Sequence, residues 1–287
     1  MNNRPVSRRK VDWAESDTEV AMGWRTGVIG AVIAGTCLGG TGVAAAVHSG
    51  PIEPAMHSVP TELRQVLAQV QPVPTDIQPL DVPERTSISV RTMVPGVGWG
   101  TANETEERAA LSISKLYIAD YALRHGDGST ADRDLCERMI RKSDDAAADR
   151  LQIKYPTAID ATAAEYGLTA THGQGDWELS TTSTADVAEF LAAKVRNEPD
   201  SPILAWMEEP ADRAADGTRQ DWGTARLPQV LGTKWGWSDL GEPEVASASF
   251  GSGFTVAAHT YGTAEDQTQD VLGVLWGVIA ELRPPRH

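Results

Sequence analysis

The pattern of hydrophobic and polar residues becomes regular only after about residue 85. Residues 87–92 alternate with β-branched side chains and residues 97–101 follow a Pro-Gly turn, which together predict a β-hairpin. Apolar residues then recur at helical spacing over residues 106–125, and a glycine-containing segment ends that pattern. Four further helices are predicted, at residues 131–140, 144–155, 158–166 and 183–196.

After residue 215 the pattern changes from helices to strands. Apolar and β-branched residues fill four segments that are separated by glycines, and a final helix is predicted at residues 268–282. The four strand segments are residues 222–227, 230–237, 245–250 and 254–261. The order of strands, helices, strands and a last helix predicts an α+β fold, in which helices flank an antiparallel sheet.

An uncharged segment of 22 residues, 26–47, precedes the patterned part of the chain. At about 1.5 Å per residue, it is just long enough to span a hydrocarbon core of about 30 Å. Five basic residues precede it and no Lys or Arg follows it until Arg64, so the positive-inside rule places the N-terminus in the cytoplasm. We interpret the segment as a transmembrane signal anchor. A cleaved signal peptide, cut after the alanines at residues 44–46, is the competing interpretation.

Seven prolines interrupt the segment between residues 48 and 84, which we interpret as a linker. The sequence therefore predicts a cytoplasmic leader, a membrane anchor or signal peptide, a Pro-rich linker and one globular domain. Their boundaries are residues 1–25, 26–47, 48–84 and 85–287. We expect a single-pass protein of the cell membrane with its C-terminal domain outside the cytoplasm; cleavage of the signal would make it secreted.

Composition narrows the range of partners. The chain of 287 residues carries 25 Lys and Arg against 40 Asp and Glu, a net charge of −15, which disfavours a nucleic-acid partner. The two cysteines, Cys37 and Cys136, lie on opposite sides of the predicted membrane boundary, so we expect no disulfide. No Cys/His spacing resembles a metal site, and we expect no cofactor. We expect a monomer that binds a small molecule or a peptide.

Three short motifs contain the residues that could carry chemistry. The first is S-x-x-K at residues 112–115, where a spacing of three places Ser112 and Lys115 on one helical face. A serine hydroxyl is a poor nucleophile until a base accepts its proton, and a desolvated lysine can act as that base. The second motif is S-D-D at residues 143–145, and the third is K-W-G at residues 234–236, in a predicted strand.

The order of these motifs resembles that of the penicillin-recognising serine hydrolases, the class A β-lactamases and D-alanyl-D-alanine carboxypeptidases. That family has S-x-x-K, then S-D-N or S-x-N, then K-T-G or K-S-G. Residues 131–151 are similar to the helix pair around S-D-N, and residues 166–172 look like a segment of the carboxypeptidases. The chain looks like a divergent, actinobacterial-type member. The resemblance covers about residues 85–285 and implies the β-lactamase/transpeptidase-like fold. The helical subdomain would be reduced, because only 27 residues separate Lys115 from Ser143.

The resemblance also implies a role for each motif. Ser112 would be the acylated nucleophile, Lys115 its general base, and Ser143 the relay that passes a proton to the leaving group. Lys234 would supply positive potential and meet a substrate carboxylate. Backbone N–H groups of Ser112 and Trp237 would form an oxyanion hole. The substrate-binding positions would be Asp145, Trp235, Gly236 and Trp237.

The motifs depart from the family at two positions. Asp145 stands in place of an asparagine, and a carboxylate can only accept hydrogen bonds, so we expect it to pair with Lys115 and keep that lysine protonated. Trp235 stands in place of a hydroxyl residue, which removes a hydrogen-bond donor and is expected to put a bulky indole there. Glu178 is the only acidic residue near the place expected for the glutamate that activates the deacylating water in β-lactamases.

Two functional hypotheses follow from these observations. The first is a membrane-anchored, extracytoplasmic serine hydrolase or acyltransferase that acts on peptidoglycan peptides, or on a related amide or ester, through an acyl-Ser112 intermediate. The alternative is a module of the same fold that has lost catalysis and binds cell-wall fragments or a protein partner. Ser143 and the two aspartates after it also have a purely structural interpretation as a helix N-cap.

Overall fold

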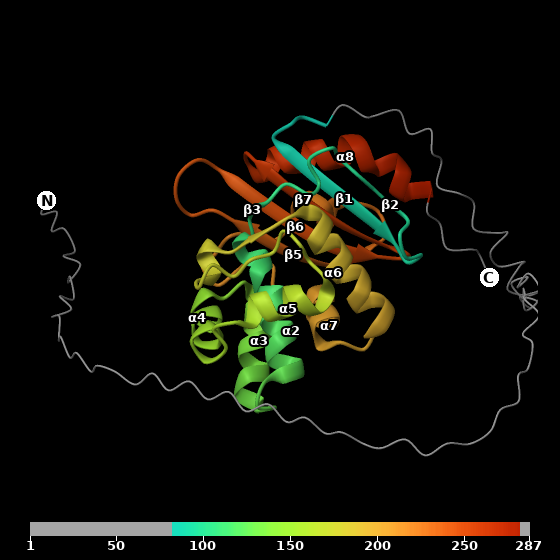
Figure 1. Cartoon of the computed structure of the whole chain (residues 1–287). Coiled ribbons are helices and arrows are strands. Elements are labelled where there is room, and N and C mark those ends of the chain that lie inside the picture. The colour runs from blue at the N-terminus through green and yellow to red at the C-terminus, as the bar shows by residue number, and fades with distance from the viewer. Residues whose placement is uncertain (1–81, 282–287) are drawn as a thin grey trace, which may run out of the picture. The chain divides into compact units, whose positions relative to one another are not determined.

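The computed structural model describes residues 82–281 (Figure 1). The strands are β1 (Thr86–Thr92), β2 (Gly98–Gly100), β3 (Arg108–Ala109), β4 (Thr181–Thr182), β5 (Val230–Trp237), β6 (Glu244–Gly251) and β7 (Phe254–Tyr261). The α-helices are α2 (Ser114–His125), α3 (Thr130–Lys142), α4 (Asp145–Lys154), α5 (Ala158–Tyr166), α6 (Thr184–Asn197), α7 (Pro202–Glu208) and α8 (Ala264–Glu281). Three short 3-10 helices are η1 (Leu111–Ile113), η2 (Trp177–Leu179) and η3 (Gly223–Arg226).

Five of the strands form one antiparallel sheet in the order β2-β1-β7-β6-β5. Strand β1, from the start of the described region, pairs along its whole length with β7, near the end of the chain. Strand β5 lies at the edge of the sheet and pairs only with β6. The edge position leaves the far side of β5 open to the helical part of the protein, and the K-W-G motif lies on this strand.

Helices cover both faces of the sheet (Figure 1). Helix α8 packs on one face, where Val271, Leu275 and Ile279 join Ile88 and Val256 of the strands in one apolar cluster. Helix α6 packs on the opposite face, against β1, β6 and β7. Helix α7 packs against β5, and helices α2, α3, α4 and α5 lie below the sheet in Figure 1.

Helix α2 is the central element of the helical layer. Eight of its twelve residues are buried, and they include polar side chains such as Lys115 and Asp120. A surface helix has one apolar stripe, so burial on several sides is typical of a helix surrounded by others. Helices α3, α4, α5 and α7 contact α2, and the ring of Tyr117 meets that of Phe190 on α6 edge-on.

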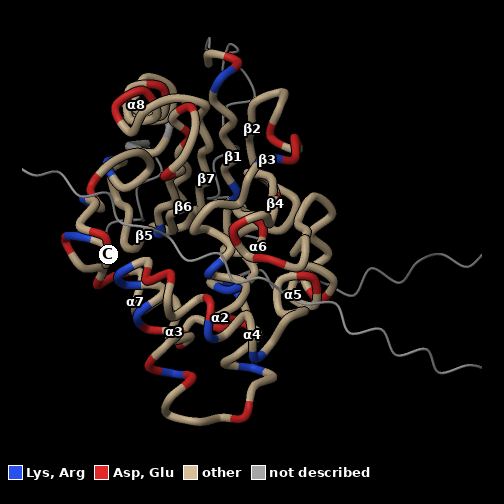
Figure 2. Tube along the Cα trace, turned by 90° about the vertical axis from the view of Figure 1, so that its left-hand side faces the viewer, with Lys and Arg blue, Asp and Glu red and all other residues tan. Residues whose placement is uncertain are grey.

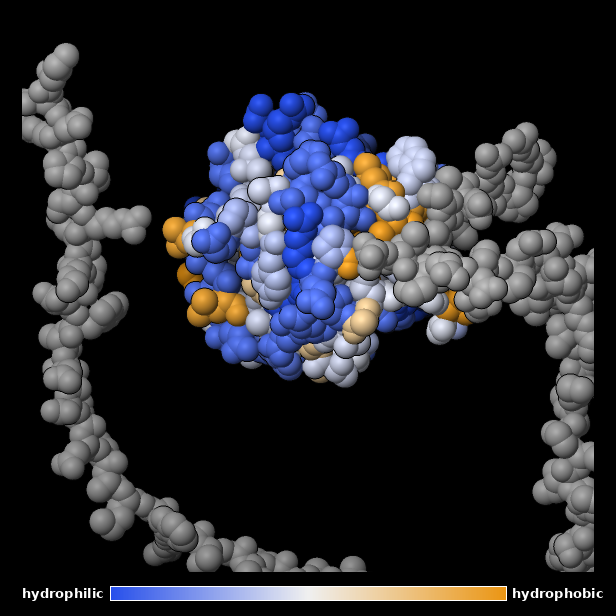
Figure 3. Space-filling model, turned by 90° about the horizontal axis from the view of Figure 1, so that it is seen from above, coloured by the Kyte–Doolittle hydropathy of each residue, from blue (hydrophilic) through white to orange (hydrophobic). Residues whose placement is uncertain are grey.

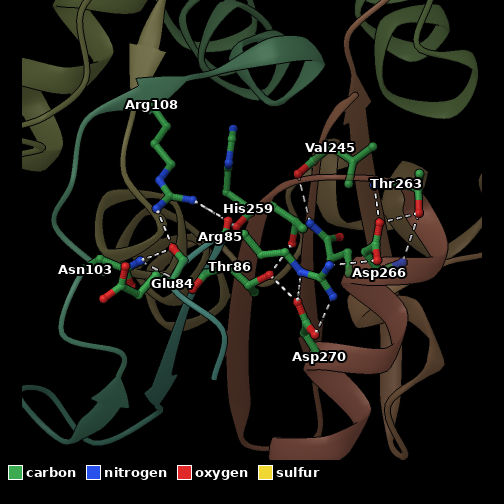
Figure 4. A network of polar contacts seen from close by, with 12 residues as sticks. Glu84, Arg85, Thr86, Asn103, Arg108, Val245, His259, Thr263, Asp266 and Asp270 are labelled. Atoms are coloured by element: carbon green, nitrogen blue, oxygen red, sulfur yellow. Dashed lines mark hydrogen bonds and ion pairs between the residues drawn. The ribbon is translucent and has the colours of Figure 1, made fainter. Parts of the chain in front are cut away.

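Ion pairs and hydrogen bonds hold α8 against the start of β1 (Figure 4). The Arg85 guanidinium donates to Asp270 at 3.0 Å and pairs with Asp266 at 2.9 Å, and the Thr86 hydroxyl donates to Asp270 at 2.6 Å. Asp266 also accepts from the backbone N–H of Thr263, whose hydroxyl accepts from the Asp266 N–H in return. This reciprocal capping begins the helix. Seen from above, hydrophilic residues cover most of the surface and hydrophobic ones form small separate patches (Figure 3).

The structure confirms the predicted α+β class, with an antiparallel sheet flanked by helices. The predictions for residues 158–166, 230–237 and 254–261 coincide with α5, β5 and β7. The predicted strand at residues 245–250, and the predicted helices at residues 131–140, 144–155 and 183–196, lie within one or two residues of the observed bounds.

Two predicted elements are wrong. Residues 106–125 were expected to form one helix, but β3 pairs with β4 at its start and Leu111 adopts a left-handed backbone (φ 51°), so α2 begins only at Ser114. Residues 222–227 were expected to form a strand. Gly223 instead has φ +65° and donates its N–H to Thr268, which turns the chain into η3.

Other elements have signals that the sequence-based prediction did not use. Helix α7 begins at Pro202, a residue that favours the first position of a helix, and no element was expected there. Helix α8 begins four residues earlier than expected because of the capping by Thr263 and Asp266. Within residues 82–281, no helix combines the length and the hydropathy that crossing a membrane needs. The predicted leader, anchor and most of the linker lie outside the described residues.

A buried ion pair between α2 and α6 yields a prediction about stability. The side chains of Asp120 and Lys194 are each 1% exposed, and they meet at 2.7 Å. Lys194→Met should lower the free energy of unfolding by about 3 kcal/mol, because Asp120 then stays buried with only Arg124 as a cationic partner. Asp120→Leu combined with Lys194→Met should recover most of that loss, because no buried charge remains.

The measurement is urea unfolding of the full chain, with Lys142→Met as the control. Lys142 is exposed, so its substitution should change the free energy of unfolding by less than about 0.5 kcal/mol. Equal stability of Lys194→Met and the wild type would show that the pair does not hold the two helices together.

Candidate active site

Ser112 and Lys115 meet at the start of the central helix. Ser112 lies in η1, one residue after the left-handed Leu111, and Lys115 lies in the first turn of α2. The Lys115 Nζ is 2.6 Å from the Ser112 Oγ, within hydrogen-bond distance. The Lys115 side chain is fully buried, whereas Ser112 is 8% exposed and borders an open cleft.

A strained turn between α3 and α4 places Ser143 against both motif lysines. Ser143 has φ 50°, a left-handed conformation that is uncommon for residues other than glycine. In this conformation its carbonyl oxygen accepts from Lys115 Nζ at 3.0 Å, and its hydroxyl accepts from Lys234 Nζ at 2.7 Å. Ser143 therefore joins α2 to the edge strand of the sheet. Backbone strain of this kind is concentrated at functional sites.

The two residues after Ser143 have different tasks. Asp144 caps α4, because its carboxylate accepts from the Ala147 N–H at 3.1 Å and pairs with Arg138 at 2.6 Å. This agrees with the structural interpretation of the motif for Asp144. Asp145, the first residue of α4, instead turns its half-exposed carboxylate to Lys115 Nζ and forms an ion pair with it.

The Lys115 amine has a pKa below its ordinary value. Burial removes water from the ammonium and lowers the pKa, and the negative charge of Asp145 acts in the opposite direction without cancelling the effect of burial. The expected pairing of Asp145 with Lys115 is present. The effect of Asp145 on Lys115 has the expected direction, toward the protonated form, but the sequence did not show the loss of water at the fully buried amine, which lowers the pKa.

Lys234 is also fully buried, and its pKa is well below the ordinary value. Burial is the main cause, and the positive charge of Lys115 adds to it. Besides Ser143, the Lys234 Nζ donates to the carbonyl oxygen of Trp235 at 2.8 Å. The two lysines and Ser143 therefore form a continuous polar network behind the Ser112 hydroxyl.

Gly236 allows β5 to lie directly against the turn that carries Ser112. A Cβ atom added at Gly236 would lie 2.9 Å from the Ser112 backbone nitrogen and 2.9 Å from the Leu111 Cβ. Both distances are shorter than a nonbonded carbon contact allows, so any larger residue would push the strand away. The K-W-G motif thus needs its glycine to keep the sheet edge and Ser112 in contact.

Trp235 does not reach the cleft. Successive strand residues point to opposite faces, and Trp235 points away from Lys234. Its side chain is buried beside Trp222 and Val245, and its indole N–H donates to the Trp222 carbonyl at 2.9 Å. The expectation of a bulky indole inside the site is therefore wrong, although the hydroxyl donor is still missing from this position.

An open cleft of about 260 Å³ gives access to Ser112. It is lined by Leu111, Ser112, Asp145, Trp177, Glu178, Trp237, Ser238, Asp239 and Leu240. Of the predicted site residues, Ser112, Asp145 and Trp237 line the cleft, whereas Lys115, Ser143 and Lys234 lie buried behind it.

Sequence patterns did not identify Trp177 as a site residue. Its ring lies 4.3 Å from Lys115 Nζ, in a cation–π contact, and its indole N–H donates to Asp149 at 2.9 Å. It belongs to η2, a single turn in a long loop, where no periodic pattern marks its position. Glu178 follows it in the cleft wall. Burial and the carboxylates of Asp176, Asp149 and Asp145 raise the pKa of Glu178.

The described residues offer no ready metal site. Within residues 82–281, no group of three or more His, Cys, Asp and Glu side chains is placed to hold a metal ion. Cys136 is a buried free thiol in α3, far along the helix from Ser143, and Cys37 lies outside the described residues.

No protein-family model and no curated protein matches the sequence. Several solved structures match the fold. A variant of the last common ancestor of Gram-negative class A β-lactamases has 18% identity, covers 70% of this chain and 94% of its own, and gives a TM-score of 0.51. The β-lactamase from Sphaerobacter thermophilus has 18% identity, coverages of 70% and 93%, and a TM-score of 0.51. The β-lactamase from Streptosporangium roseum has 16% identity, coverages of 77% and 96%, and a TM-score of 0.50.

These matches confirm the β-lactamase/transpeptidase-like fold that the motif order implied. Identities of 16–18% show the fold alone, since one fold can carry many activities. The function of this chain must therefore be argued from its own site.

Proposed function

We propose that the protein is a serine acyl-transfer enzyme, a hydrolase or acyltransferase that acts on amides or esters through an acyl-Ser112 intermediate. The contact of 2.6 Å between Lys115 Nζ and Ser112 Oγ, next to an open cleft, carries this proposal. A lysine with a lowered pKa loses its proton more readily, and its neutral amine can accept a proton from a serine hydroxyl. Peptidoglycan peptides are the substrate class that the family resemblance suggests.

The geometry supports a two-stage reaction. The Ser112 Oγ bonds to the acyl carbon while its proton passes to the neutral Lys115 amine. The bond to the leaving group then breaks, and the Lys115 ammonium gives up the proton, which the leaving group takes; the Ser143 hydroxyl, held by Lys234, is the relay that the family resemblance suggests for this transfer. Water, or another acceptor, attacks the acyl-serine, releases the acyl group and restores the Ser112 hydroxyl.

Backbone groups on either side of the Gly236 contact suit the stabilisation of the oxyanion. The N–H groups of Ser112 and Trp237 lie on the two elements that Gly236 brings together. One such donor contributes about 3 kcal/mol to transition-state stabilisation in serine hydrolases. A substitution at Gly236 should therefore affect the geometry of the oxyanion hole as well as packing.

A second candidate function, a binding module without catalysis, is favoured by one observation. Lys115 Nζ has three acceptor groups, Ser112 Oγ, Ser143 O and Asp145 Oδ1, which match the three N–H donors of an ammonium. A base needs a lone pair directed at the Ser112 hydroxyl, and a protonated Lys115 has none. Asp145 therefore favours the inactive protonation state.

The two candidate functions differ in how the protein should react with penicillin. Trp235 offers no hydroxyl to the carboxylate of a β-lactam, and a lost hydrogen bond to a charged group costs about 1.5–3 kcal/mol, or roughly 10- to 150-fold in affinity. We expect slow or absent turnover of penicillin, with any acyl group attached only to Ser112. The measurement is intact-mass spectrometry after long incubation with a penicillin and, separately, with an uncharged p-nitrophenyl ester.

The matched control is Ser112→Ala, which should show no acyl adduct with either reagent. An adduct that persists in this variant would rule out Ser112 as the nucleophile. Rapid multiple turnover of penicillin would contradict the degenerate second and third motifs. The absence of any adduct on the wild type would favour the binding module.

We also propose that the folded domain lies outside the cytoplasm and is anchored by residues 26–47. Support comes from the five basic residues before this segment and from the absence of Lys and Arg between residues 48 and 63. In intact cells, protease should remove a C-terminal tag and spare an N-terminal one. Protection of the C-terminal tag would contradict the proposed topology, and loss of the whole leader from the mature chain would show a cleaved signal.

A further inference from the structure

The cleft next to Ser112 combines apolar and acidic walls. Leu111, Trp177, Trp237 and Leu240 supply its apolar surface, and Leu240 is 87% exposed at its mouth. Asp145, Glu178 and Asp239 supply carboxylates. Among the nine described residues that line it, none is a lysine or an arginine.

The two lysines nearest to the cleft are poorly placed to bind an anion. Lys115 and Lys234 are fully buried, and their amines already donate to Ser143, Asp145 and the Trp235 carbonyl. The neighbouring strands add no cation, since β6 and β7 contain neither lysine nor arginine (Figure 2). A ligand carboxylate in this cleft would therefore meet no lysine or arginine side chain among the described residues that line it.

The raised pKa of Glu178 is a further indication that the cleft disfavours anions. Its pKa is raised by burial and then by the nearby carboxylates of Asp176, Asp149 and Asp145. Only Lys115 among the groups that affect it acts in the opposite direction. Burial says nothing about the sign of the local potential, but the three neighbouring carboxylates make that potential negative around Glu178, which repels anions and attracts cations.

We propose that the cleft selects apolar esters or amides that are uncharged or cationic, and disfavours those that carry a carboxylate. This inference rests on the proposed acyl chemistry at Ser112 and narrows its substrate class, away from the stem peptides with a free terminal carboxylate that the family resemblance suggests. Leu240, Trp237 and Trp177 provide apolar surface for the uncharged part of the ligand. The acidic residues then decide between ligands of equal shape and different charge.

The test uses three p-nitrophenyl esters of phenylacetic acid that differ only at the para position of the acyl ring. This position carries hydrogen, a trimethylammonium group or a carboxylate. At low ionic strength, we expect kcat/KM to be at least about tenfold higher for the cationic ester than for the anionic one, and the ratio to fall as salt is added. A ratio of one or less would overturn the proposal.

Paired variants separate the effect of the cleft from that of overall charge. Glu178→Gln combined with Asp239→Asn should reduce the preference to about threefold or less. The control combines Asp134→Asn with Asp200→Asn, which changes the net charge by the same amount at exposed residues that do not line the cleft. The control should keep the wild-type preference, and an equal loss in both pairs would overturn the assignment to the cleft.

Binding measurements keep this inference distinct from the proposed catalysis. The corresponding three phenylacetamides are titrated calorimetrically into the full chain carrying Ser112→Ala, which cannot be acylated at that position. Tighter binding of the cationic amide, together with no Ser112-dependent release of p-nitrophenol, would uphold the ligand preference and reject the catalysis. Equal or tighter binding of the anionic amide, or no binding of any amide, would reject the ligand preference.

Discussion

The burial of two lysine side chains beside one serine is the constraint on which the rest of the site depends. Lys115 and Lys234 are both fully buried, and a buried ammonium is costly unless hydrogen bonds and negative charge replace its water. Ser143 supplies two acceptors, Trp235 supplies a carbonyl oxygen, and Asp145 supplies the one carboxylate in direct contact. The left-handed turn at Ser143 meets this need for acceptors, because it lets one residue accept hydrogen bonds from both lysines.

The same constraint links the site to the fold. Helix α2 can bury Lys115 because helices surround it, and β5 can bring Lys234 to the same point because it is the edge strand of the sheet. Gly236 removes the last side chain that would keep the strand and the serine turn apart. Asp145 then has opposing effects: it stabilises the buried Lys115 charge, and by raising the Lys115 pKa it lowers the fraction of neutral amine that activation of Ser112 requires.

Sequence patterns predicted the regular parts of this structure well. The observed bounds of the strand β5 and the helix α5 agree with the prediction, and α5 ends at Gly167 as expected. The motif order also pointed to residues that the structure places together, although only geometry shows which of them lie in the open cleft. Errors arose where tertiary contacts override local propensity, as at Leu111 and Gly223, whose left-handed backbones end an apparently continuous element.

The orientation of Trp235 and the position of Trp177 could not be predicted from local sequence patterns, because both depend on contacts between distant segments. The direction of Trp235 depends on which face of β5 packs against Trp222, and Trp177 reaches Lys115 from a loop that lies far away in sequence. Burial also lowers the Lys115 pKa, and no sequence pattern shows how completely an amine is removed from water. The acidic character of the cleft likewise depends on loops that meet only in the folded chain.

The most direct test of this account is the pH dependence of Ser112 acylation by an uncharged p-nitrophenyl ester, in the wild type and in Asp145→Asn. Acylation requires neutral Lys115, so its rate should rise with pH as that amine loses its proton. Asp145 raises the Lys115 pKa, so its replacement should move the rise to lower pH and increase the rate on the acidic side. Asp200→Asn serves as the control and should leave the profile unchanged. A profile in Asp145→Asn that stays in place or moves to higher pH would contradict the central role of the Lys115–Asp145 pair.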